Sequence, residues 1–368
     1  MHREHEVCEV PGVRTSCLAI AGALAAGCGA SSPQPPPSTP LASPPAPGAP
    51  APPPPLGDIA LPGSTGDGIG MDYLLFDPRT HAVWVPAGNT GSVDVIDTGT
   101  GKLTRIEGFA TREVERRGKK HLIGPSSAAL GEGVVYIGNR GDSSVCAVDD
   151  TKLVKGACGT LDSSPDGIVY VAPTKEVWVS TPRDHSIRIL DAATLAQKAR
   201  IAFDGDPEGY AVDARRGRFY TNLEDKDVTL AIDLASHAIV ATWKSACGED
   251  GPHGLRLAEP EGFLFIACSA KTETMDVGHD GAIVGTIDTG DGADDLDYVP
   301  ATHAVYVGAG RAAKLTVARV DAKGALTLAA SAPTKEGARN PVVDAMGRVY
   351  LIHGAAAELV VVAPTLTP

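Results

Sequence analysis

Residues 209–244 read GYAVDARRGRFYTNLEDKDVTLAIDLASHAIVATWK. Four short stretches in this segment alternate apolar with polar residues, over 209–213, 218–223, 228–233 and 238–244. Turn-forming residues separate the stretches, as in Ala-Arg-Arg-Gly at 214–217. Alternation with a period of two is typical of β-strands, and closely spaced turns indicate antiparallel strands joined by hairpins. The segment therefore predicts one unit of four antiparallel strands.

One aromatic residue of this unit recurs along the chain, always within a β-branched stretch. The column consists of Trp84, Tyr136, Trp178, Tyr220, Phe265, Tyr306 and Tyr350. Neighbouring members lie 41 to 52 residues apart, and together they take seven of the 17 aromatic residues. Units of about 40–45 residues with four strands each are the blades of β-propellers. We therefore predict an all-β fold, a seven-bladed β-propeller of four-stranded antiparallel blades over residues 57–368.

The two ends of the repeat region predict how the ring closes. The last unit stops after its third strand, at residues 358–363, and lacks an outer strand. Residues 58–63, ahead of the first full unit, look like the missing fourth strand. Pairing residues 59–61 with 359–362 would complete the last blade and remove an exposed strand edge. We expect this N-terminal strand to close the ring.

Composition excludes several classes of protein. The chain has 368 residues, 43% of them hydrophobic, and a formal net charge of −13. No apolar run approaches the ~20 residues that span a bilayer, which excludes a multi-pass membrane protein. A nucleic-acid binder normally carries a basic face, so the acidic balance argues against nucleic acid as a partner.

The N-terminus predicts export. Residues 15–27 form a short apolar stretch after Arg14 that ends in small residues directly before Cys28, as in a secretory signal. Ala25-Ala26-Gly27-Cys28 resembles a bacterial lipobox, which would make Cys28 the lipidated first residue; ordinary cleavage without lipidation is the alternative. Residues 31–55 hold 13 of the 29 prolines and predict an extended stalk. We thus expect a signal peptide (1–27), a lipidated linker (28–56) and a propeller (57–368), located in the cell envelope and touching the membrane through its lipid anchor only.

A known family shares the repeat. Residues 83–98, VWVPAGNTGSVDVIDT, resemble the YVTN-type repeat of YncE-like seven-bladed propellers, and the match recurs over residues 57–368. The resemblance implies the propeller fold. Its motif is a packing motif, so it identifies no chemistry. Seven-bladed propellers include lactonases and lyases, and nucleic-acid binding has been considered for YncE-like members.

Four cysteines remain after the signal and Cys28. Cys146 and Cys158 lie almost symmetrically about the turn at residues 150–152, so a cross-strand bridge is expected there. Cys247 and Cys268 fall at the same rim of neighbouring blades. Export to an oxidising compartment favours disulfides over metal thiolates. We predict the pairs Cys146–Cys158 and Cys247–Cys268.

The channel mouth is the first candidate site. The residue 12 positions before the recurring aromatic would lie beside the central channel in five blades, and two blades with shorter first turns offer a polar residue instead. These seven mouth residues are Asp72, Ser126, Asp166, Glu208, His253, Asp294 and Asn340. Converging carboxylates repel one another, and a bound cation would relieve the repulsion. We therefore considered Asp166, Glu208 and Asp294 as ligands of a divalent cation such as Ca²⁺ or Mg²⁺, with solvated turn residues as the alternative.

A second tier of polar residues surrounds this mouth and includes Arg140, Arg183 and Asp225. Mixed charge around a concave mouth is what a small polar ligand needs, although a solvated loop rim is the simpler explanation. An insertion at 107–121 carries the chain's one basic stretch and would serve as a lid or as a docking arm for an acidic partner. A mobile surface insertion is the alternative.

These observations support two classes of function. The first is a monomeric binding or scaffold module that recognises an unidentified protein or a small polar ligand through its top face and central channel. The alternative is a metal-dependent enzyme of the lactonase or lyase kind, in which His253 acts as the base beside the cation.

Overall fold

The computed structural model describes residues 56–64, 66, 68–116 and 118–367. The predicted signal peptide, Cys28 and nearly all of the predicted linker lie outside these residues. Within the described part of the chain, no helix has the length and apolar character needed to cross a membrane.

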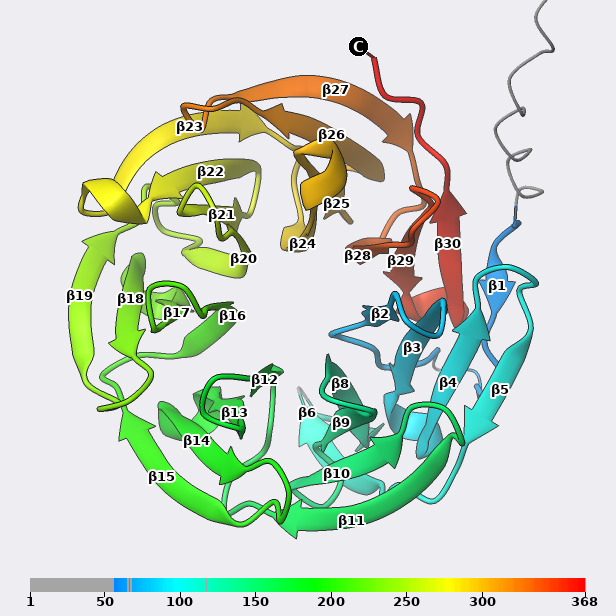
Figure 1. The fold of residues 1–368 in the computed structure, drawn as a ribbon. Coiled ribbons are helices and arrows are strands. Elements are labelled where there is room, and N and C mark those ends of the chain that lie inside the picture. The colour runs from blue at the N-terminus through cyan, green and yellow to red at the C-terminus, as the bar shows by residue number, and fades with distance from the viewer. Residues whose placement is uncertain (1–55, 65, 67, 117, 368) are drawn as a thin grey trace, which may run out of the picture. The chain divides into compact units, whose positions relative to one another are not determined.

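Seven antiparallel sheets of four strands stand around a ring, as predicted (Figure 1). We number them blades 1 to 7 in chain order. Blades 1 and 2 consist of β2 (Leu75–Asp77), β3 (Ala82–Ala87), β4 (Ser92–Asp97), β5 (Leu103–Ile106), β8 (Pro125–Leu130), β9 (Val134–Asn139), β10 (Ser144–Asp149) and β11 (Val154–Thr160). Blades 3 and 4 consist of β12 (Ile168–Val171), β13 (Glu176–Thr181), β14 (Ser186–Asp191), β15 (Gln197–Ala202), β16 (Pro207–Asp213), β17 (Arg218–Leu223), β18 (Val228–Asp233) and β19 (Ile239–Lys244).

The remaining three blades follow the same plan, with the first strand at the channel and the last at the rim (Figure 1). Blades 5 and 6 consist of β20 (Pro252–Ala258), β21 (Phe263–Cys268), β22 (Lys271–Asp276), β23 (Ala282–Asp288), β24 (Ala293–Val299), β25 (Ala304–Ala309), β26 (Lys314–Val320) and β27 (Leu326–Pro333). Blade 7 consists of β28 (Arg339–Val343), β29 (Val349–His353), β30 (Glu358–Val362) and β1 (Ile59–Ala60). Short 3-10 turns occur at η1 (Gly88–Thr90), η2 (Pro182–Asp184), η3 (Glu224–Lys226), η4 (Val277–His279), η5 (Pro300–Thr302) and η6 (Gly354–Ala356).

The N-terminal strand closes the ring. Strand β1 pairs antiparallel with β30, with Ile59 opposite Leu359 and Ala60 opposite Glu358. The Leu61 amide continues the contact by donating to the Ala357 carbonyl at 2.8 Å. Figure 1 shows β1 beside β30, between the last blade and the first. This confirms the predicted closure, which covers an edge of β30 that would otherwise be exposed.

The recurring aromatics form the contact between blades. All seven lie in the second strand of their blade and are at most 5% exposed. Each belongs to a hydrophobic cluster that includes residues of the next blade: Trp84 packs with Ile137, Tyr220 with Ile266, and Tyr350 with Val85 across the closure. The Trp178 and Phe219 rings lie 4.7 Å apart between their centroids. The aromatic column therefore fills the wedge between neighbouring blades.

Both predicted disulfides are present. Cys146–Cys158 joins directly opposite residues of β10 and β11 within blade 2. Cys247–Cys268 joins the segment after β19 to the end of β21, and so links blade 4 to blade 5.

Candidate functional site

The mouth residues lie where the inner strands begin, on one face of the ring, which we call the top. In five blades the ladder of the inner strand is interrupted there by a β-bulge or a similar irregularity. A bulge takes residues out of the ladder and re-aims their side chains. Ser126, His253, Asp294 and Asn340 lie within these irregular stretches, and Glu208 directly precedes one. The bulges therefore explain why polar side chains can occupy the mouth of a regular propeller.

Arg140 pairs with two of the mouth carboxylates, including Asp166, one of the three considered as cation ligands. Its Nη2 donates to Asp72 Oδ2 at 2.7 Å and also pairs with the Asp166 carboxylate, while Nε donates to the Pro165 carbonyl at 3.3 Å. Burial alone would lower the pKa of Arg140, but the two carboxylates raise it above its ordinary value. One guanidinium thus joins blades 1, 2 and 3 and neutralises two of the predicted mouth carboxylates.

Glu208 forms a second contact at the mouth, with Tyr73, and also hydrogen-bonds Asp166. The Tyr73 hydroxyl donates to the Glu208 carboxylate across the channel. Burial, reinforced by the charges of Asp166 and Asp72, raises the pKa of Glu208 well above its ordinary value. Burial likewise raises the pKa of Asp166, against the opposing effect of Arg140. Two carboxyl groups in such surroundings favour sharing a proton over carrying two charges.

Asn340 and Arg339 hold the third part of the mouth. Asn340 is buried in the left-handed conformation, with φ of 50°, which Asn tolerates better than most residues. Its Nδ2 donates to Asp294 Oδ2 at 2.9 Å and to the Asp72 carbonyl at 3.3 Å. The Arg339 Nη1 pairs with the same Asp294 carboxylate. Blades 6, 7 and 1 are therefore joined at the mouth.

His253 lies beside Glu224 of η3. Its Nδ1 lies 3.2 Å from Glu224 Oε1, and its backbone carbonyl accepts a hydrogen bond from Asn222. It lines a separate cavity of 380 Å³ together with Asp294, Arg311 and Arg339. The proposed general base consequently has Glu224 rather than Asp166 or Glu208 as its partner.

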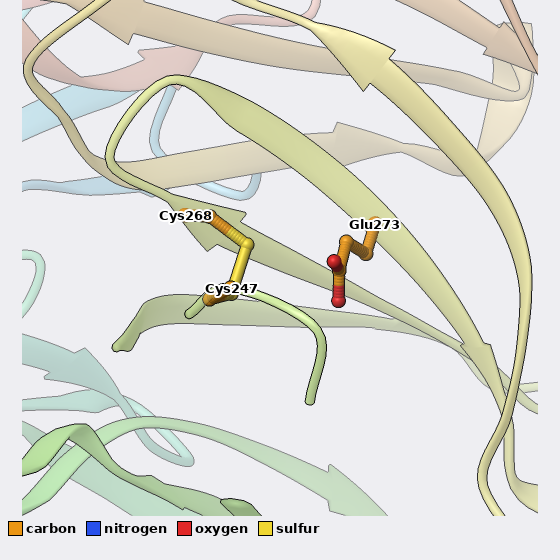
Figure 2. Close-up of side chains that lie close together, drawn as sticks. All are labelled: Cys247, Cys268 and Glu273. Carbon is orange, nitrogen blue, oxygen red and sulfur yellow. A yellow bond between two sulfur atoms is a disulfide. The ribbon is translucent and has the colours of Figure 1, made fainter. Parts of the chain in front are cut away.

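The candidate metal ligands do not gather. A metal site needs at least three ligand atoms close together. Among the described residues, one such group of carboxylate, imidazole or sulfur atoms lies within 4.8 Å, and it consists of Cys247, Cys268 and Glu273. Figure 2 shows that the sulfurs of Cys247 and Cys268 are bonded to each other as a disulfide. Disulfide sulfurs are not thiolates, and Glu273 Oε1 already lies 2.7 Å from Lys271 Nζ. Neither this cluster nor Asp166, Glu208 and Asp294 provides the ligand set of a metal ion.

The rim residues separate into two groups. Arg183, on η2, lines the same cavity as Asp72, Ser126, Arg140 and Asp166. Asp225, on η3, is exposed and lies outside that cavity, with its Oδ1 accepting a hydrogen bond from the Asp206 amide at 2.8 Å. Ser126 is buried, and its carbonyl accepts from the Tyr73 amide at 3.0 Å.

The basic insertion forms a hairpin at the mouth. Strands β6 (Arg112–Arg116) and β7 (Lys119–Ile123) pair with each other, and β7 lies against η1. The hairpin walls two adjoining cavities. The channel cavity, of 420 Å³, contains the Asp72, Arg140 and Asp166 side chains in its lining. The hairpin cavity, of 580 Å³, is lined in part by Lys120, His121 and Leu122. Both cavities share Arg140 and Arg339.

Sequence reasoning missed several of these residues. Tyr73 and Arg339 are immediate neighbours of the predicted Asp72 and Asn340. An irregularity at the start of β28 places Arg339 and Asn340, whereas Tyr73 lies ahead of β2 and bridges to Ser127 of blade 2. Deeper in the channel, Arg256 Nη2 pairs with Asp295 Oδ2 at 2.9 Å. Arg256 lies directly opposite the aromatic Phe265 in the ladder. The position opposite the aromatic is apolar in five blades and charged in two, at Arg256 and Asp297. These two charged residues were the signal for an ion cluster in the channel.

Comparisons with known proteins support the fold. No protein-family model matches the chain, and no curated protein does. Solved structures that resemble it include a chain of the mitotic checkpoint complex (13% identity, TM-score 0.66, covering 88% of this chain and 98% of that one), hydrazine synthase of Kuenenia stuttgartiensis (14%, 0.66, 83% and 97%) and virginiamycin B lyase of Staphylococcus aureus (13%, 0.63, 82% and 96%). At such low identity these likenesses show the fold alone. The chain is a seven-bladed β-propeller.

Proposed function

We propose that this chain is a non-catalytic binding propeller of the cell envelope, and that it binds a small polar ligand in the two cavities under the β6–β7 hairpin. One observation carries the proposal. The cavities are walled by blades 1, 2, 3 and 7 together with the hairpin, and they hold charged side chains from several blades beside apolar ones. Concave sites with a few converging polar groups are where propellers and other folds bind small molecules.

The contacts at the mouth favour binding over metal-dependent catalysis. Asp72 and Asp166 are neutralised by Arg140, Asp294 by Arg339, and Glu208 accepts from Tyr73. These partners supply the charge compensation for which a cation had been considered. Because His253 pairs with Glu224, the base and the candidate ligands of the lactonase- or lyase-like alternative are not assembled.

The location in the envelope rests on the sequence. We propose residues 1–27 as a signal peptide, Cys28 as the lipidated residue, residues 28–56 as a linker and 57–368 as the binding domain. The two disulfides support this assignment, because disulfides persist in oxidising compartments.

Ligand binding is tested by thermal shift with a panel of small acids, bases, zwitterions and neutral polar compounds. The protein is compared with a variant in which residues 112–121 are replaced by a short Gly-Ser turn. A ligand of the folded state stabilises it by RT ln(1 + [L]/Kd), about 2.7 kcal/mol at a hundredfold excess over Kd. We expect at least one compound to raise the Tm of the parent and not of the variant. If no compound does so, the mouth is not a small-ligand site and the proposal fails.

A further inference from the structure

The hairpin cavity has an unusual charge for this protein. The whole chain carries a formal net charge of −13. Yet the ionisable side chains lining this cavity are Lys120, His121, Arg140 and Arg339, against a single carboxylate, that of Glu113. The lining of this cavity thus carries more cationic than anionic side chains, unlike the protein as a whole.

Part of this positive charge is available to a ligand. Arg339 pairs with Asp294 through Nη1, and among the described residues none accepts a hydrogen bond from its Nε or Nη2. Lys120 Nζ lies 2.7 Å from Glu113 Oε1, but these side chains are 73% and 55% exposed. Exposed ion pairs contribute little, so Lys120 can exchange Glu113 for a ligand anion at small cost. Arg140 has two carboxylate partners, Asp72 and Asp166, whereas Arg339 has one, Asp294.

Part of the cavity wall is apolar. Ile69, Met71, Leu122, Ile123 and Ile352 all line it. Leu122 belongs to the hairpin and is 49% exposed, although most large apolar residues of the described chain are buried. An exposed leucine at the edge of a cavity is explained when an apolar group packs on it.

We propose that the hairpin cavity binds an organic anion, a carboxylate or phosphate monoester carried on an apolar body. Its head group lies between Arg339 and Lys120, and its body packs on Leu122 and the apolar wall. This inference rests on the proposed function and adds the ligand class. A planar anion suits Arg339, because a guanidinium offers parallel donors to carboxylate and phosphate oxygens.

The test uses matched probes that differ only in charge. Hexanoate, hexanol and hexylamine form one series, and phenylacetate, phenylethanol and phenylethylamine a second; phenyl phosphate, acetate and inorganic phosphate complete the set. Binding to the full propeller is measured by calorimetry at low salt. We expect the organic anions to bind at least about tenfold more tightly than the matched alcohols and amines, and than acetate and inorganic phosphate, because hydrogen bonds between charged groups are the strong ones.

Variants locate the site. Arg339→Gln and Lys120→Gln should each weaken binding of the organic anions by about tenfold. Leu122→Ala should weaken hexanoate more than acetate. Arg311→Gln is the matched control, because Arg311 lies on the same face, pairs with Asp291 and lies outside the hairpin cavity. Melting of each variant in the absence of ligand checks that it folds, and a variant that does not fold is replaced by Arg339→Lys or Lys120→Met.

Each possible result of these experiments supports or overturns a stated part of the inference. If alcohols or amines bind as tightly as the anions, or if Arg339→Gln and Lys120→Gln leave anion binding unchanged, the inference is overturned while the broader binding function stands. If acetate and inorganic phosphate bind as tightly as the organic anions, the apolar body is overturned. If, in addition, no compound of the thermal-shift panel raises the Tm of the parent, the proposed function fails as well.

Discussion

Arg140 and Asp72 lie 68 residues apart in sequence, yet Arg140 Nη2 is 2.7 Å from Asp72 Oδ2. The same guanidinium reaches Asp166 in the next blade. Three blades thus meet in one ion cluster whose side chains are about one-fifth exposed, at 22%, 20% and 15%. Because like charges on Asp72 and Asp166 would repel, the cluster depends on the arginine between them.

Removing this arginine tests the cluster. Arg140→Gln should lower the free energy of unfolding by about 2–3 kcal/mol, since it leaves two largely buried carboxylates without their cation. The control is Arg200→Gln, whose exposed pair with Asp184 should contribute less than about 1 kcal/mol. Urea unfolding at neutral pH measures both. Equal losses in the two variants would show that the mouth cluster contributes no more than a surface pair.

The channel carboxyls predict an unusual pH dependence. Burial raises the pKa of Asp297 to about 6. A carboxyl with a raised pKa in the folded state holds its proton more tightly than the unfolded chain does. Its contribution to stability is therefore greatest below the unfolded pKa of 3.8 and falls as the pH rises to about 6. As the pH rises over this range, the free energy of unfolding of the parent should fall relative to that of Asp297→Asn, as measured by urea unfolding at each pH.

Asp321→Asn is the control for the effect of Asp297→Asn on the pH dependence of stability. Asp321→Asn removes an exposed carboxylate whose pKa is lowered below 3.8 by backbone hydrogen bonds. Its effect on stability should therefore have the opposite sign and appear only as the pH falls below that value, leaving the range between pH 4 and 6 unchanged. If the stability of the parent and of Asp297→Asn changes in parallel between pH 4 and 6, Asp297 does not titrate there.

The two disulfides should stabilise the folded ring by different amounts. Cys146–Cys158 closes a separation of 12 residues inside one blade, whereas Cys247–Cys268 closes 21 residues and joins two blades. Replacing either pair by serines should cost about 2–4 kcal/mol, with the larger loss for the inter-blade bond in the chain-entropy account. Urea unfolding of each double variant, with the reduced parent for comparison, measures the losses. No difference between reduced and oxidised parent would contradict the expectation.

Closure by β1 can be tested with two truncations. A chain that begins at residue 62 lacks Ile59 and Ala60 and exposes the edge of β30, so it should unfold at lower temperature and associate through that edge. A chain that begins at residue 57 keeps β1 and is the matched control. Equal melting temperatures and equal monodispersity in light scattering would show that the strand is dispensable.

Lipid anchoring is tested in the full chain. We expect the exported protein to partition into detergent and the Cys28→Ser variant to stay in the aqueous phase, because only the former would carry acyl chains. Mass spectrometry of the mature N-terminus distinguishes lipidation from ordinary cleavage. An unmodified Cys28, or cleavage elsewhere, would overturn the anchor.

The fold could be read from the sequence because its information is local and repeated. Tyr220 and its six counterparts each mark a second strand, and the turns around them set the hairpins. The short segment at residues 58–63 made sense only as the missing strand of the last blade. Each of these inferences needed only alternation, turn residues and a count of units, which recur seven times and so reinforce one another.

The mouth was predicted less completely. Counting back from the aromatics found Asp72 and Asp166, and the shorter first turn of the last blade pointed to Asn340. The cation considered beside Asp166 left out Arg140, which pairs with both Asp72 and Asp166. Arg140 belongs to the segment after a second strand, and nothing in its local sequence says which carboxylates it will meet. His253 shares the Pro-x-Gly surroundings of Asp166 and Glu208, and yet it pairs with Glu224.

Local sequence thus specifies the strands and the number of blades of this protein, because hairpin pairing and the packing of consecutive blades depend on residues close in the chain. The closing strand followed from counting strands, since the last unit lacks its fourth and Ile59 pairs with the distant Leu359. The pairing of charges at the mouth depends on ring closure, which brings together side chains from blades 1, 2, 3, 6 and 7. Arginine and tyrosine side chains are long enough to reach several carboxylates there. Which carboxylate each one pairs with depends on distances and burial in the folded ring, and these cannot be read from a single repeat.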